Sequence, residues 1–156
     1  MEPNKKLADV LNGLIEINND RVEGYKNAAE ETKAIDLDLQ AVFHKLAADS
    51  TKFVGELSAE VVKLGDHPAE GTTNLGKVFR VWMDIKATFT GKDRTAILES
   101  CEYGEDAAQK AYESAMESDA EMSSDIRQLV ASQKSDLKTA HDMIKNYRNI
   151  HEAVNV

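Results

Sequence analysis

Hydrophobic residues recur every three or four positions in five stretches of the chain, the spacing that places side chains on one face of a helix. These stretches predict four long helices and one shorter helix, over 7–32, 36–64, 93–117 and 124–149 and, for the shorter one, over 74–89. Gly65 and Pro68 end the second long helix, because glycine suits the position after a helix and proline cannot continue one. We therefore predict an all-α chain that forms a single domain over 1–156.

The order of the helices predicts how they are connected. Simple up-and-down bundles need only short loops, whereas ferritin-like bundles join two helix pairs by a long crossover. The segment 65–91 is long enough to cross the bundle and contains the short amphipathic helix. The prediction is a ferritin-like four-helix bundle with an extra short helix in the crossover between its second and third long helices.

Composition and charge exclude several classes of function. The chain has 28 acidic and 19 basic residues and a formal net charge of −9, which opposes binding to the phosphate backbone of nucleic acids. No run of about 20 apolar residues is present, so we expect no membrane span. No signal sequence is visible at the start, and we expect a cytoplasmic protein. A single cysteine, Cys101, is expected to be a small core residue.

Five segments carry a resemblance to a known family. They are Glu23-Gly-Tyr-Lys-Asn-Ala-Ala-Glu30, Phe43 to Phe53 with Glu56-Leu57, Val81-Trp-Met-Asp-Ile-Lys86, Cys101-Glu-Tyr-Gly-Glu-Asp-Ala107 and Ala140-His-Asp-Met-Ile144. The chain resembles a bacterial family of four-helix-bundle proteins of unknown function, placed in the ferritin-like superfamily, over roughly 7–147. The resemblance implies a ferritin-like fold and no settled activity. Related bundles are linked to stress responses, which suggests a stress-associated role.

A di-iron site is the chemistry to test in such a bundle. It usually takes a Glu from each of two helices and a Glu-x-x-His motif from each of the other two. No Glu-x-x-His occurs here, and Lys138 stands three residues before His141 where a carboxylate is wanted. The remaining candidate metal ligands are Glu105, His141, Glu23, Asp49 and Asp136. Glu105 with His141 is either a remnant metal pair or a buried hydrogen bond.

Helical phase, at about 100° per residue, gives a second test. The polar side chains nearest the centres of the apolar stripes are the uncharged Asn18, Ser50 and Gln133. Glu105 and His141 lie about 60° from those centres, close enough to turn inward. We therefore predict an uncharged polar layer in the middle of the bundle, held by hydrogen bonds and too poor in anions for two irons.

Three hypotheses of function follow. The first is a non-enzymatic bundle with a structural or stress-associated role, without a cofactor or catalytic residues, that self-associates through Phe79, Trp82 and Phe89. Those aromatic residues could equally cover the core of their own chain. The second is a metalloprotein for iron handling or oxidation, with the candidate ligands above. The third is a module that binds a small ligand beside the alanine-rich third long helix.

Overall fold

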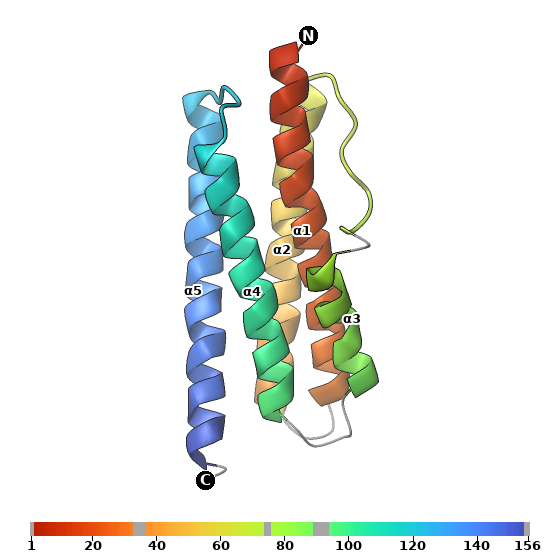
Figure 1. Ribbon diagram of the computed structural model, residues 1–156, viewed down its shortest axis with the longest axis vertical. Helices are drawn as coiled ribbons and strands as arrows, with labels where there is room; N and C mark the ends of the chain where they lie inside the picture. The colour runs from red at the N-terminus through yellow and green to blue at the C-terminus, as the bar shows by residue number, and fades with distance from the viewer. Residues whose placement is uncertain (1, 33–36, 74–75, 89–93, 155–156) are drawn as a thin grey trace.

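A computed structural model describes residues 2–32, 37–73, 76–88 and 94–154. Within these ranges the chain is all helical, as predicted (Figure 1). Its five helices are, in chain order, α1 (Glu2–Thr32), α2 (Leu37–Lys63), α3 (Lys77–Thr88), α4 (Arg94–Glu117) and α5 (Ser124–Val154).

The two outer helix ends differ from the predicted bounds. α1 begins at Glu2 rather than at residue 7, because Pro3 falls in the first turn, where its missing N–H has no intrahelical partner to lose. α5 continues to Val154 rather than ending at 149, because no glycine or proline interrupts its last turn. The predicted bounds at 36, 74, 89 and 93 fall outside the described residues.

Two helix ends carry the capping groups that their sequences suggest. Gly65 follows α2 with a φ of 84°, a left-handed conformation that glycine adopts without a steric cost. Its N–H donates to the carbonyl of Val62 at 2.9 Å, and the next N–H donates to that of Val61 at 3.2 Å, which ends the helix. Before α5, Ser123 Oγ accepts a bond from the N–H of Ile126 at 3.2 Å.

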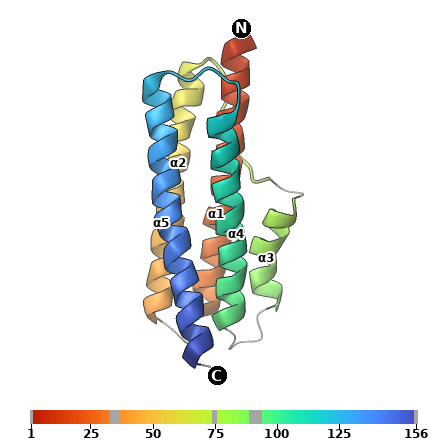
Figure 2. The same ribbon diagram turned by 60° about the vertical axis from the view of Figure 1, so that its left-hand side comes forward.

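The four long helices form a bundle of two antiparallel pairs, α1 with α2 and α4 with α5 (Figures 1 and 2). α3 packs against α1 and α4. In Figure 2 it lies on one side of the bundle, while α2 and α5 form the opposite side. The two sides of the bundle are therefore covered differently.

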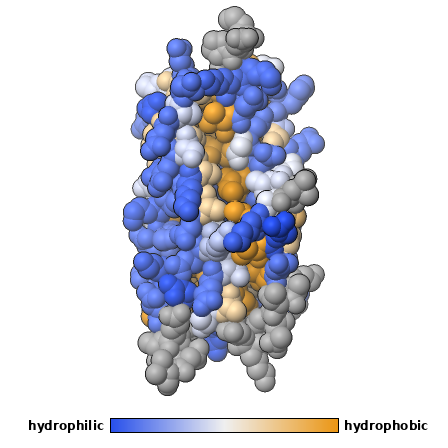
Figure 3. All heavy atoms as spheres, in the orientation of Figure 1, coloured by the Kyte–Doolittle hydropathy of each residue, from blue (hydrophilic) through white to orange (hydrophobic). Residues whose placement is uncertain are grey.

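Two hydrophobic clusters fill the interior. One contains Leu11, Leu57 and Val130, and the other contains Phe43 and Ile144. In the first cluster, Leu7, Leu11 and Leu14 of α1 show the spacing of four and three residues that predicts a helix. On the face formed by α1 and α4, a narrow line of hydrophobic residues runs between wide polar flanks (Figure 3). None of the described helices is both long enough and apolar enough to span a membrane.

Side-chain amides on α1 hold the crossover loop along the outside of the bundle. Asn12 Nδ2 donates to the carbonyl of His67 at 3.1 Å, and Asn12 Oδ1 accepts from the N–H of Ala69 at 2.7 Å. About two helical turns further along α1, Asn19 Nδ2 donates to the carbonyl of Gly71 at 2.9 Å. These bonds satisfy backbone groups that an irregular segment would otherwise leave to water.

Asp20 makes the last attachment of this loop to α1. Its two carboxylate oxygens accept from the N–H and the hydroxyl of Thr73, at 3.0 and 2.6 Å. The side chain is buried, and burial raises the pKa of Asp20 despite the two bonds from Thr73. The loop thus reaches α3 after three successive attachments to a single helix.

Trp82 joins α3 to the core by entering between two glycines. A Cβ added to Gly24 would lie 2.0 Å from the indole, and one added to Gly104 would lie 2.1 Å from it. Trp82 is fully buried in its own chain, so it covers its own core, which is the second of the two places that the sequence left open. Phe79 is half-buried, and Phe89 lies outside the described residues.

Candidate functional site

A buried ion pair lies at the centre of the bundle, between the two hydrophobic clusters. Arg21 of α1 donates from Nε to Glu105 Oε1 at 2.6 Å and from Nη2 to Oε2 at 2.9 Å. Each residue is only 1% exposed. A bidentate arrangement of this kind uses both oxygens of the carboxylate and is the strongest geometry for such a pair.

Glu105 keeps the buried side chain of Arg21 in its charged form. Burial alone lowers the pKa of Arg21, but the negative charge of Glu105 and its hydrogen bonds more than compensate and raise it. The guanidinium therefore stays protonated inside the protein. Its remaining nitrogen, Nη1, donates to Ser50 Oγ on α2, and the guanidinium also lies over the ring of Tyr25 at 5.2 Å from its centroid.

From Arg21 a chain of hydrogen bonds runs through the interior. Ser50 Oγ donates to Asn18 Oδ1 at 2.9 Å, and Asn18 Nδ2 donates to Tyr112 Oη at 2.8 Å. Asn18 also donates to the carbonyl of Leu14 at 2.8 Å. The chain therefore passes from α1 to α2, back to α1 and then to α4.

The same chain continues to the other side of the bundle. Tyr112 Oη donates to Gln133 Oε1 on α5 at 2.7 Å, and Gln133 Nε2 donates to Glu56 Oε1 on α2 at 3.1 Å. Every link donates in the same direction, from the cation of Arg21 to the carboxylate of Glu56. Hydrogen bonds aligned in this way polarise one another. Burial raises the pKa of Tyr112, so its hydroxyl keeps the proton that it donates.

The structure brings the three predicted polar-layer residues, Asn18, Ser50 and Gln133, together in the interior, but the prediction that the layer is uncharged is wrong. Arg21, which the sequence analysis missed, adds a cation, and Glu105 adds an anion. A signal was present in the sequence. Arg21 lies seven residues after Leu14, on the same side of the helix, but a search for apolar residues passes over it.

Aromatic rings and the cysteine lie beside the ion pair. The ring of Tyr25 lies 4.9 Å from that of Trp82 and 5.7 Å from that of Phe43. Tyr25 Oη and Trp82 Nε1 are buried without a hydrogen-bond partner among the described residues. Burial, and then the negative charge of Glu105, raise the pKa values of Tyr25 and of Cys101 well above their ordinary range. Neither is therefore prepared to act as a nucleophile.

Glu105 and His141, the first two candidate metal ligands, are not neighbours. Glu105 is held by Arg21, whereas His141 Nε2 lies 2.5 Å from Asp106 Oδ1 and its Nδ1 lies 3.2 Å from Asp142 Oδ1, near the surface. Burial alone lowers the pKa of His141, but the bonds to Asp142 and Asp106 outweigh it and raise the pKa. The candidate pair is thus divided between two separate ion pairs.

The other three candidate ligands lie outside the interior. Glu23 is exposed on α1. Asp49 and Asp136 line the same groove, of about 260 Å³, between α2 and α5, and Lys45 and Lys52 line it with them. Lys45 Nζ lies 2.9 Å from Asp49 Oδ2. Two carboxylates already accompanied by two ammonium groups are poor ligands for a divalent metal.

The interior therefore does not match a di-iron centre. Such a centre needs several inward carboxylates and imidazoles at one level of the bundle. Here Glu105 is the one fully buried acidic group of the polar layer, and both its oxygens accept from Arg21. Among the described residues, no three His, Cys, Asp or Glu side chains gather closely enough to hold a metal ion.

The fold places the chain in a structural class. It is similar to the X-ray structure of the bacterioferritin of Desulfovibrio desulfuricans, a protein described with a diiron site, with a TM-score of 0.77 and 19% identity. The match covers 95% of this chain and 81% of that chain. The molecule is a ferritin-like helical bundle, which confirms the predicted fold class and its short crossover helix. At this level of identity the similarity concerns the fold alone.

The sequence family is narrower than this class. Residues 6–118 match the family described as a domain of unknown function, DUF2383, and the chain belongs to that family. This confirms the resemblance to a ferritin-like bundle family without an assigned function. The match ends before α5, so Gln133 and His141 lie beyond it. No curated protein matches the chain.

Proposed function

We propose that this chain is a non-catalytic ferritin-like bundle with a structural role, which acts through its outer surface. The observation that supports the proposal is the pair of Arg21 and Glu105. The cation that neutralises the buried carboxylate is a side chain of the protein itself. The groups of the polar layer that would otherwise face a ligand already bond to one another.

The alternative, a metalloprotein for iron handling or oxidation, requires Glu105 to exchange its guanidinium for a metal. That exchange would leave Arg21 buried without its counter-charge, which typically costs about 3–5 kcal/mol. The ion pair therefore favours the structural role over the metal site. The fold similarity to a bacterioferritin is the observation that keeps iron as the cation to test.

The experiment is a measurement of bound metal. The protein is produced in iron-supplemented medium and purified without chelators. Iron per chain is then measured by inductively coupled plasma mass spectrometry. We expect far less than one iron per chain, and no change in Glu105→Gln. Glu99→Gln, which alters an exposed carboxylate on the same helix, is the matched control.

A stoichiometric amount of iron that disappears in Glu105→Gln and remains in Glu99→Gln would overturn the proposal. Iron that disappears in His141→Ala would do the same, because His141 was the other half of the candidate metal pair. Iron that both control and test variants retain equally would show that the metal binds elsewhere, and the interior would then still be structural.

We extend the proposal to a stress-associated role in the bacterial cytoplasm, on the basis of the family resemblance. A strain without the protein is expected to survive oxidative or osmotic challenge less well than its parent. Complementation with Glu105→Gln together with Arg21→Met, which removes both charges of the ion pair, should restore survival. Equal survival of parent and deletion strain under each challenge would remove the stress-associated part.

A further inference from the structure

The side of the bundle formed by α2 and α5 is its loosest seam. α1 packs closely on α2, and α4 packs closely on α5, but α2 and α5 approach each other at few points. A groove of about 260 Å³ opens between them. Leu46 and Phe53 of α2 and Ala140 of α5 form its apolar floor. α3, which lies on the other side of the bundle, does not cover this seam (Figure 2).

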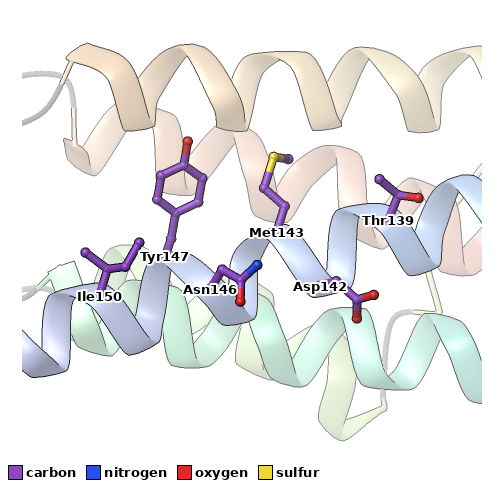
Figure 4. Close-up of a pocket in the computed structure, with 6 residues that line it drawn as sticks. All are labelled: Thr139, Asp142, Met143, Asn146, Tyr147 and Ile150. Atoms are coloured by element: carbon purple, nitrogen blue, oxygen red, sulfur yellow. The ribbon is translucent and has the colours of Figure 1, made fainter.

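The same seam continues into an apolar edge at the end of α5. Met143, Tyr147 and Ile150 are spaced by four and three residues, so they lie on one side of the helix. Figure 4 shows Met143 and Tyr147 directed toward α2. Both line a hollow of about 480 Å³ whose other lining residues also belong to α5. Met143 and Tyr147 are half-buried, and Ile150 is 58% exposed. The row of apolar residues therefore ends in one exposed side chain, that of Ile150.

The length of α5 explains why this edge is uncovered. α5 has 31 residues, whereas α2 has 27 and α4 has 24. At 1.5 Å per residue, α5 is about 10 Å longer than its partner α4. Its last turns extend past the neighbouring helices in Figures 1 and 2. Ile150 lies near the end of that extension and is 58% exposed.

The charges on the rims of the groove suggest what covers it. Lys52 lies on the α2 rim and Asp136 on the α5 rim, and both line the same groove, so they are at the same level of the bundle. A two-fold axis parallel to the helices turns a second copy so that its α5 faces α2 of the first. Lys52 then meets the partner's Asp136, and the contact occurs twice. Complementary rims of this kind set the register of an interface.

The area is sufficient for a stable dimer. A seam as long as α2 is about 40 Å long, and two helices 8–10 Å apart present a face about 20 Å wide. Such a face offers roughly 800 Å² per copy, which is the size of a standard specific interface.

From these observations we infer that a second copy of this chain packs on the α2–α5 seam about a two-fold axis parallel to the helices. Met143, Tyr147 and Ile150 form the apolar part of the contact, and Lys52 and Asp136 form its charged part. The inference deepens the proposed function, because it names the partner of the outer surface. It is tested by mass in solution rather than by metal content, so the two proposals can fail separately.

The first experiment compares two substitutions of equal exposure. Ile150 is 58% exposed and lines the hollow at the end of α5, and Val62 is 59% exposed on α2 and lines neither that hollow nor the groove. Light scattering after size exclusion at micromolar concentration should give twice the chain mass for the wild type. Ile150→Glu should raise the dissociation constant at least tenfold, and Val62→Glu should leave it unchanged. A monomeric wild type, or a greater effect of Val62→Glu, would overturn the inference.

The second experiment separates contacts between copies from contacts within one chain. Lys52→Asp and Asp136→Lys each place like charges on facing rims, so each variant alone should dissociate. In a mixture of the two variants, both contacts of the two-fold pair become attractive again, while each chain still carries like charges across its own groove. Native mass spectrometry should therefore detect the mixed dimer in excess of either pure one. A mixture that stays as monomeric as its components would overturn the proposed register.

Discussion

The α1–α4 side of the bundle and the α2–α5 side are both built from long amphipathic helices, but they differ in what covers them. On the first side, the chain's own α3 inserts Trp82 between Gly24 and Gly104. On the second, an open groove with Lys52 and Asp136 on its rims has no covering element among the described residues. The two glycines of the first side allow a close contact within the chain. The charged rims of the second side suit a reversible contact with another molecule.

The polar chain connects the two sides. It begins at Glu105, the neighbour of Gly104 in α4, and ends at Glu56 on the edge of α2 that meets Gln133. Its interior members are fully buried and bond to one another. The comparison indicates that the interior specifies how the four helices are arranged, while the exposed seam is where we propose that a partner binds.

The largest effect on the free energy of unfolding is expected from breaking the ion pair of Arg21 and Glu105, where the chain of hydrogen bonds begins. Arg21→Met leaves the carboxylate of Glu105 buried without its counter-charge, which should destabilise the protein by about 3–5 kcal/mol. Arg21→Met combined with Glu105→Met replaces the pair by apolar groups of similar size and should recover most of that loss. Urea unfolding followed by circular dichroism measures both. A loss in the double variant equal to the sum of the losses in Arg21→Met and Glu105→Met alone would show that the pair is not coupled.

The next largest effect on stability is expected on the α1–α4 side, which α3 covers. Gly24→Ala places a Cβ at 2.0 Å from the indole of Trp82, and we expect a destabilisation of about 3 kcal/mol. Gly13 lies in the same helix with no atom within 4 Å of an added Cβ. Gly13→Ala should therefore stabilise the protein by about 0.5–1 kcal/mol, because alanine is the better helix former. Thermal unfolding of both variants checks the opposite signs.

A smaller effect is expected at the middle of the polar chain, where the two sides are linked. Tyr112→Phe removes the hydroxyl that accepts from Asn18 and donates to Gln133, at a cost of about 2 kcal/mol. Tyr103, on the same helix, is 37% exposed. Tyr103→Phe is the control and should change the free energy of unfolding by less than about 0.5 kcal/mol. Similar values for the two would contradict a continuous chain.

The smallest effect belongs to the α4–α5 seam, where His141 lies between Asp106 and Asp142. The pKa of His141 is raised from 6.5 in the folded protein, so its contribution is fully present below about pH 6.5 and is lost as the pH rises through the raised value. We expect the wild type to lose about 0.5 kcal/mol between pH 6 and pH 8 relative to His141→Gln. Urea titrations at the two pH values test this, with His44→Gln as the control.

The fold could be predicted because its signals are local. The apolar spacing, Gly65 and Ser123 act within one or two turns, and each is satisfied in the structure as the sequence suggests. The orientation of α3 could not be predicted in this way. An amphipathic helix with an aromatic face can pack inward or outward, and only the distant Gly24 and Gly104 decide that Trp82 points inward.

The interior was predicted less completely, for a related reason. Helical phase located Asn18, Ser50 and Gln133, because it depends only on position within one helix. It gave no weight to Arg21, since a long cationic side chain on an apolar stripe is buried only when a carboxylate on another helix compensates it. That partner, Glu105, lies 84 residues away in sequence. Pairing across helices is therefore the information that periodicity lacks.

The amides of α1 that hold the crossover loop have a consequence for the asymmetry of the whole molecule. A free linker of this length could carry α3 to either flank of the bundle with little difference in entropy. Asn12, Asn19 and Asp20 instead attach it at three successive points along one helix, so the loop leads α3 to the flank where Trp82 enters. Three short polar side chains of a single helix thus hold the loop on one flank and leave the other flank open to a neighbour.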